Sequence, residues 1–318
     1  MADTTPPAGL LRPLGFGELF DRAVTLYVRN FVPFSLIVLA VMLPYSILQY
    51  SSQARSLAQL GTMLDTATGA KTPADPLSAY GASLGDAAFA VLLLLVFVLV
   101  LPFVFSAVAM GVARLYRGEA VDFRACYGRA FRRFWPMMGL IGMGILIFIG
   151  SYLGVVLVAV MVVAITSGLA QLGTVMLVFG IAVDVVLGLA AIGLMIVMSL
   201  AMGFAIFAIV IEERRVFDAI GEGFARIFSR GEFGRALLFA LAWMAISMVS
   251  VGAVYAVMFL AIYLHQPWLV TLENVVVTTV TYAFSTVLLA VYYYDVRVRR
   301  EGLDLETQLE QLTTSTPA

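Results

Sequence analysis

The chain has 318 residues, of which 62% are hydrophobic and only 12% charged, and its formal net charge is -1. A soluble domain carries about 25% charged and about 45–50% apolar residues, so the composition excludes a soluble globular protein and indicates an integral membrane protein. The charge balance gives no reason to expect nucleic acid as a partner, and the single cysteine, Cys126, excludes a disulfide within the chain.

Six apolar stretches are long enough to cross a membrane, since a helix needs about 20 apolar residues to span roughly 30 Å of hydrocarbon. They lie at about 32–50, 87–113, 136–165, 187–211, 236–264 and 268–294. Residues 1–22 contain acidic side chains and lack the basic segment and apolar core of a cleaved signal peptide. We therefore expect the first transmembrane helix to direct insertion, and we expect the connection 51–86 to form an outer loop.

The fourth crossing is harder to place, because apolar sequence is continuous from Leu169 to Ile211. As one helix this stretch would be about 65 Å long, more than a single crossing needs. Counting back from the charged Glu212, we expect the crossing to begin near Leu187. Residues 168–186 would then lie on or dip into the outer face, with Asp184 at the outer boundary.

Lys and Arg residues set the predicted orientation. Seventeen of the 19 fall on the side of the N-terminus, and only Arg55 and Lys71 fall on the other. Because basic residues accumulate in cytoplasmic segments, this distribution predicts that both termini are cytoplasmic.

Three twelve-residue windows resemble one another: "FDRAVTLYVRNF" (20–31), "FRACYGRAFRRF" (123–134) and "FDAIGEGFARIF" (217–228). Phe opens and closes each window, and Arg29, Arg132 and Arg226 take the tenth place. Each window precedes a pair of apolar stretches. Either the chain contains an internal duplication, or any helix that enters a membrane from its positive side looks like this. In the first window Phe20, Val24, Tyr27 and Phe31 have helical spacing and predict one apolar face.

These observations predict an all-α integral membrane protein with six transmembrane helices in three hairpins. We expect each hairpin to follow a cytoplasmic amphipathic helix that lies in the membrane interface. The predicted membrane domain is 15–306, with repeat units 15–117, 118–211 and 212–306. A cytoplasmic tail (1–14) precedes it and a disordered tail (307–318) follows.

Three tracts resemble a bacterial family of multi-helix membrane proteins: "LRPLGFGELFDRAVTLYVRNF", "FAIVIEERRVFDAIGEGFARIFSRGEFGRAL" and "YYYDVRVRREGLDLE". The family is known as the glycerophosphoryl diester phosphodiesterase membrane domain. The resemblance implies a multi-pass module of the bacterial plasma membrane, here without an attached phosphodiesterase. This chain has one histidine, His265, and no His-Arg-Gly motif. We therefore expect no enzymatic activity, no cofactor and no metal site.

The C-terminal run 292–306 is densely charged after a long apolar stretch. One interpretation is a positive-inside stop signal, with Tyr292–Tyr294 as aromatic residues at the membrane boundary. The other is a cytoplasmic ring of ion pairs that joins Glu212, Asp295 and the repeated arginines. The candidate lipid-headgroup or ion-pair residues are Arg29, Arg132, Arg226, Glu212, Asp295, Arg297 and Arg299.

Two classes of function stay open. The first is a non-enzymatic module that binds anionic lipid headgroups or partner proteins through a basic cytoplasmic face; a membrane-protein partner or a homo-oligomer would fit it. The second is a transporter or flippase for lipids or amphiphilic small molecules. The predicted span centres carry no charge, and Glu273 is expected to face the outer headgroups, which favours the first class. The hydroxyl groups of the last span would either line a lipid groove or bond to their own helix: Thr278, Thr279, Thr281, Ser285 and Thr286.

Overall fold

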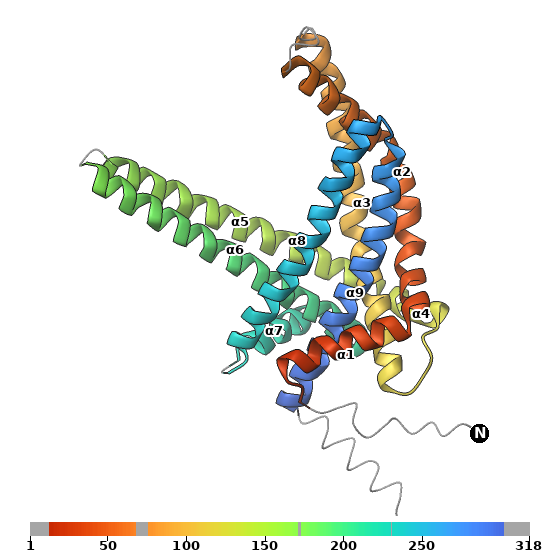
Figure 1. Ribbon diagram of the computed structural model, residues 1–318. Coiled ribbons are helices and arrows are strands. Elements are labelled where there is room, and N and C mark those ends of the chain that lie inside the picture. Colours follow the sequence, from red (N-terminus) through yellow and green to blue (C-terminus); the bar gives the residue numbers. More distant parts are fainter. Residues whose placement is uncertain (1–12, 68–75, 171–172, 230, 302–318) are drawn as a thin grey trace, which may run out of the picture. The chain divides into compact units, whose positions relative to one another are not determined.

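Figure 1 shows a computed structural model of the chain, which describes residues 13–67, 76–170, 173–229 and 231–301. Within these ranges the chain forms nine α-helices and no strand. Three are short: α1 (Phe16–Arg29), α4 (Phe123–Arg132) and α7 (Val216–Ile227). Six are long: α2 (Phe31–Ala67), α3 (Pro76–Tyr116), α5 (Phe134–Ala170), α6 (Thr174–Ile211), α8 (Phe233–Leu264) and α9 (Trp268–Glu301). The predicted all-α class is confirmed.

Each of the six long helices contains a stretch that is long and apolar enough to cross a membrane. In lipid every backbone N–H and C=O must be satisfied inside the protein, which is why such apolar sequence forms unbroken helices. The described part of the chain thus contains six helices able to cross a membrane, the number that the sequence predicts. The predicted tail 307–318 and residues 1–12 of the predicted N-terminal tail lie outside the described residues.

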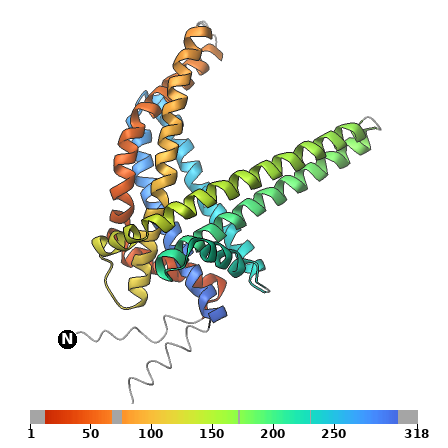
Figure 2. The ribbon, with the colours of Figure 1, turned by 180° about the vertical axis from the view of Figure 1, so that it is seen from behind.

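The predicted separate segment 168–186 is wrong for residues 174–186. Helix α6 begins at Thr174 and runs to Ile211 without a break, so these residues belong to the same helix as the fourth crossing. The start of the crossing itself near Leu187 stays a prediction. The helix starts after Gly173, whose φ of 128° suits a residue without a side chain. Helix α5 likewise extends to Ala170, and both helices are about 55 Å long at 1.5 Å per residue. Figure 1 and Figure 2 show them running side by side.

The predicted outer loop 51–86 is also largely helical. Helix α2 continues to Ala67, and α3 already begins at Pro76. Polar residues join the two extensions: the Arg55 guanidinium lies 2.9 Å from the Asp86 carboxylate, and the Gln59 amide donates to the same carboxylate at 3.4 Å. The helices therefore continue past their apolar stretches because they stabilise each other there.

The chain divides into two compact units. Unit 1 comprises residues 1–132 and 243–318, and unit 2 comprises residues 133–242. In unit 1, α9 packs against α1, α2 and α3, and α4 packs against α3. In unit 2, α6 packs against α5 and α7.

Every short helix packs against a long helix of its own unit. Helix α4 packs on α3 and α7 on α6, in each case the long helix that precedes it in the chain, and α1 packs on α9. The cores lie at these contacts, because the fully buried side chains of α3, α6 and α9 concentrate in their C-terminal halves. At Gly223 of α7 the approach is so close that a Cβ atom would lie 2.4 Å from the carbonyl oxygen of Ala201.

The buried face of α1 differs from the predicted one. Leu19, Ala23 and Tyr27 are buried, whereas Val24 and Phe31 of the predicted face remain 46% and 44% exposed. Tyr27 reaches α9, where its hydroxyl donates to the Val280 carbonyl at 3.3 Å. The helix therefore has one apolar side against protein and further apolar residues on its exterior.

Candidate functional site

The three repeated arginines take the same place in the secondary structure. Arg29, Arg132 and Arg226 each lie in the last turn of a short helix. A cation there interacts favourably with the carbonyl end of the helix. Their surroundings differ, however, since Arg226 is only 1% exposed whereas Arg29 and Arg132 are exposed.

Arg226 forms a buried ion pair inside unit 2. Its two terminal nitrogens, Nη1 and Nη2, lie 2.8 and 3.1 Å from the two carboxylate oxygens of Glu212. The Glu222 carboxylate lies 3.3 Å from its Nε atom, so two acidic residues surround one guanidinium. Paired hydrogen bonds between a guanidinium and a carboxylate are among the strongest in proteins. Since Glu212 ends α6 and Arg226 lies on α7, this pair fixes α7 to α6.

The link between α6 and α7 carries a second ionic contact. Glu213 has a φ of 59°, a left-handed conformation that is uncommon for a residue with a side chain. Its carboxylate forms an ion pair with Arg133, the residue before α5. Glu212 thus pairs with a residue of α7, and Glu213 pairs with the residue that precedes α5. Both glutamates therefore have a structural role inside unit 2.

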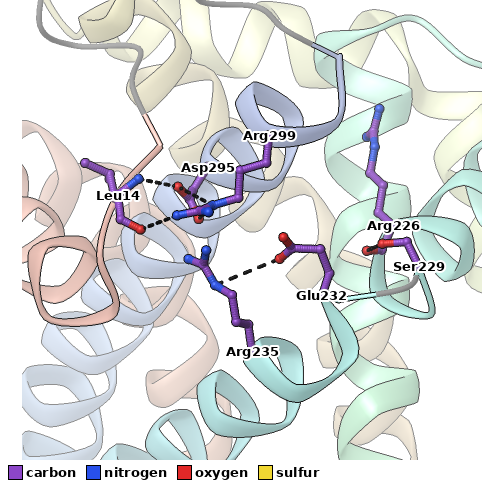
Figure 3. A network of polar contacts seen from close by, with 7 residues as sticks. All are labelled: Leu14, Arg226, Ser229, Glu232, Arg235, Asp295 and Arg299. Atoms are coloured by element: carbon purple, nitrogen blue, oxygen red, sulfur yellow. Dashed lines mark hydrogen bonds and ion pairs between the residues drawn. The ribbon is translucent and has the colours of Figure 1, made fainter.

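Asp295 and Arg299 of α9 hold the chain where it enters α1 (Figure 3). The Leu14 N–H donates to Oδ1 of Asp295 at 2.7 Å, and Arg299 donates to the Leu14 carbonyl at 2.6 Å. The two side chains also pair with each other at 3.2 Å, one helical turn apart. The Asp295 side chain is fully buried. Asp295 and Arg299 of the C-terminal run therefore have a structural role in addition to any role in stopping transfer.

The tyrosines that precede Asp295 are part of the core of unit 1. Tyr292, Tyr293 and Tyr294 are all buried, and the Tyr294 ring packs on Tyr116 of α3 with centroids 4.6 Å apart. Half-buried Arg297 lies over the Tyr293 ring at 6.0 Å. These tyrosines therefore pack against protein, and their predicted place at the membrane boundary stays a prediction.

The structure thus places four of the seven candidate residues in ion pairs, one pair in each unit. Glu212 and Arg226 belong to unit 2, and Asp295 and Arg299 belong to unit 1. A ring that joins all of them stays a prediction. Within the described ranges, neither Arg29 nor Arg132 has a hydrogen bond or an ion pair with another side chain.

Aromatic side chains are exposed next to the two unpaired arginines. Phe31 directly follows the last turn of α1 and is 44% exposed. Phe131 directly precedes Arg132 in the chain, Trp135 follows it by three residues, and these two side chains are 57% and 80% exposed. Aromatic rings and arginines together are typical of the interface between lipid and water.

The prediction that Glu273 faces the outer headgroups is wrong. Glu273 is only 6% exposed, so its side chain is directed into unit 1 and does not face the outer headgroups. The only signal for this was its position inside an apolar span, where an ionisable residue is a candidate for function.

A cavity of about 390 Å³ lies in unit 1 between α3, α8 and α9. Thr278, Thr281 and Ser285 line it, as a groove would require. Thr286 instead donates to the carbonyl of Tyr282 in its own helix at 2.7 Å. Three of the predicted hydroxyl residues therefore line a cavity and a fourth bonds to its own helix, and lipid binding by the cavity stays a prediction.

A second cavity of about 620 Å³ lies in unit 2 between α5 and α6. Half-buried Asp184 lines it and accepts a hydrogen bond from the Thr166 hydroxyl at 3.4 Å. Among the described residues, no three His, Cys, Asp or Glu side chains come together as metal ligands would. Comparisons of the chain with family models, with curated proteins and with solved structures gave no match.

Proposed function

We propose that the chain is a non-enzymatic module of the bacterial plasma membrane whose basic cytoplasmic face binds anionic lipid headgroups. The proposal rests on the exposure of Arg29 and Arg132 and on their lack of an acidic partner among the described residues. Both also lie where a short helix meets a long apolar one.

The proposal includes the predicted topology, with both termini cytoplasmic and α1, α4 and α7 lying in the inner interface. Its support is the uneven distribution of Lys and Arg and the recurrence of a short helix before each pair of long ones. The apolar residues on the exterior of α1 would then enter the lipid while Arg29 meets headgroups. The resemblance to the phosphodiesterase membrane-domain family agrees with such a module and stays part of the proposal.

Ion pairs within the protein limit which arginines are available to bind lipid headgroups. Arg226 and Arg299 form ion pairs with buried carboxylates, so their charges contribute little attraction to an external phosphate. An arginine near an anionic lipid surface contributes about 1 kcal/mol when its charge is free. Arg29 and Arg132 are therefore the residues whose loss should weaken lipid binding.

The test compares Arg29→Gln, Arg132→Gln and the double variant in nanodiscs of phosphatidylglycerol and of phosphatidylcholine. Each substitution should lower the free energy of unfolding by about 1 kcal/mol in the anionic lipid and leave it unchanged in the neutral one. Native mass spectrometry should show fewer retained phosphatidylglycerol molecules on the double variant.

Arg117→Gln is the matched control. Arg117 is exposed and lies on the same predicted face, but its guanidinium already pairs with Glu119 at 3.0 Å. Its loss should therefore be independent of the lipid. An equal loss in both lipids for Arg29 and Arg132, or no loss at all, would contradict headgroup binding.

A further inference from the structure

A carboxylate without a partner is buried in unit 1. Glu273 lies on α9 inside a membrane-spanning stretch and is 6% exposed. Both of its carboxylate oxygens are buried and accept no hydrogen bond from any described residue. Burying such a group in its ionised form without a donor or a cation costs several kcal/mol, and a positively charged occupant would remove this cost.

The surrounding seam between α2 and α9 is rich in hydrogen-bond acceptors. The Ser46 hydroxyl of α2 donates to Asn274 at 3.3 Å, and Thr271 donates to Gln53 of α2 at 3.1 Å. Gln49 lies between Ser46 and Gln53 on the same side of α2. Its Oε1 is buried without a donor among the described residues. Among the described residues, three acceptor oxygens on these two helices thus lack a donor, two on Glu273 and one on Gln49.

One hydrogen bond joins these contacts to the wall of the cavity of unit 1. The Thr278 hydroxyl lines the cavity and lies 3.5 Å from Oδ1 of Asn274, the atom that also accepts from Ser46. Val277, another lining residue, lies one helical turn from Glu273. The cavity wall combines Trp243 and aliphatic side chains with hydroxyl groups, and two of these, on Ser250 and Thr281, bond to each other at 3.0 Å.

We propose that this region binds an amphiphilic primary ammonium ion. Its ammonium group lies at Glu273, where three N–H bonds fill the free acceptors, and its apolar chain occupies the cavity. An anionic amphiphile is excluded because it would meet the Glu273 carboxylate. The site at Glu273 requires a positively charged ligand, whereas the proposed headgroup surface requires a negatively charged one. An experiment can therefore contradict either proposal without contradicting the other. A ligand held inside a membrane-spanning unit is also what the second predicted function, transport of amphiphiles, would need.

Trp243 allows the binding to be measured directly. The chain has three tryptophans, and the other two, Trp135 and Trp268, are 80% and 50% exposed and can be replaced by Phe at little cost. In that background, bromododecylamine should quench Trp243 fluorescence saturably in neutral-lipid nanodiscs, because its chain is long enough to extend from Glu273 toward Trp243 and bromine quenches on contact. Bromododecanol has the same chain without the charge and should bind more weakly.

Glu273→Gln should weaken bromododecylamine binding by about tenfold or more, since it removes a charge-assisted hydrogen-bond acceptor. It should leave bromododecanol binding unaffected. Asp184→Asn is the matched control, because it removes a membrane-span carboxylate from unit 2 and should change nothing. Arg29→Gln with Arg132→Gln should also bind the amine normally.

A second variant, Val251→Phe, tests the cavity independently of Glu273 if Glu273→Gln does not fold. Val251 lines the cavity and is 51% exposed, so Val251→Phe reduces the cavity without disturbing the core. It should weaken amine binding while Glu273 stays in place. Equal affinity of the amine for the wild type and Glu273→Gln would overturn the proposal. Equal affinity of the alcohol and the amine for the wild type, or unchanged amine binding in Val251→Phe, would overturn it as well.

Discussion

Replacing Arg226 by Met should destabilise unit 2 more than the loss of either exposed arginine of the repeat. The guanidinium is 1% exposed and donates two hydrogen bonds, of 2.8 and 3.1 Å, to the carboxylate of Glu212, whose side chain is 8% exposed. Hydrogen bonds to charged groups contribute about 1.5–3 kcal/mol each, which gives about 3–6 kcal/mol for the two. Breaking a buried ion pair from one side costs about 3–5 kcal/mol, because the remaining charge is left buried. We therefore expect a loss of about 3–5 kcal/mol.

The assay is reversible unfolding in neutral-lipid nanodiscs, with Glu212→Gln and the double variant completing a thermodynamic cycle. The double variant should be more stable than the sum of the two single losses predicts, because neither charge is then stranded. Arg132→Met is the control, since this arginine is exposed and should change stability little in neutral lipid. Additive losses, or a loss below about 1 kcal/mol for Arg226→Met, would refute the reasoning.

Two further predictions concern the short helices. Gly223→Ala should destabilise unit 2 by about 1–3 kcal/mol, because the new Cβ would lie 2.4 Å from a backbone oxygen of α6. Gly221→Ala in the same helix meets nothing within 4 Å and should be neutral or slightly stabilising, so equal effects of the two substitutions would contradict the close packing. Burial raises the pKa of the Cys126 thiol in α4 to about 11. At about pH 7.5, well below that pKa, the reactive thiolate is scarce, so maleimide should label Cys126 only after denaturation; labelling of the folded protein would contradict its burial.

The sequence determined the class, the six crossing segments and the three short helices, because each of these depends on local properties. An apolar stretch of sufficient length becomes a transmembrane helix whatever lies beside it. The windows around Arg29, Arg132 and Arg226 were recognisable for the same reason, since a helix with basic residues in its last turn is a local pattern. Even so, the limits of α6 were misjudged, because length alone does not show where helices extend past the hydrocarbon.

Tertiary structure decided which of these residues are paired. Arg226 and Arg132 have the same place in the repeat, yet only Arg226 meets a carboxylate, because α7 packs on α6 where Glu212 ends that helix. Asp295 binds the backbone of Leu14, 281 positions away in the chain, and no local pattern could have indicated this contact. Glu273 is buried for the same reason, since the side of α9 that is covered depends on the helices packed around it. Burial and pairing are properties of neighbours brought together by folding, and spacing along one chain does not contain them.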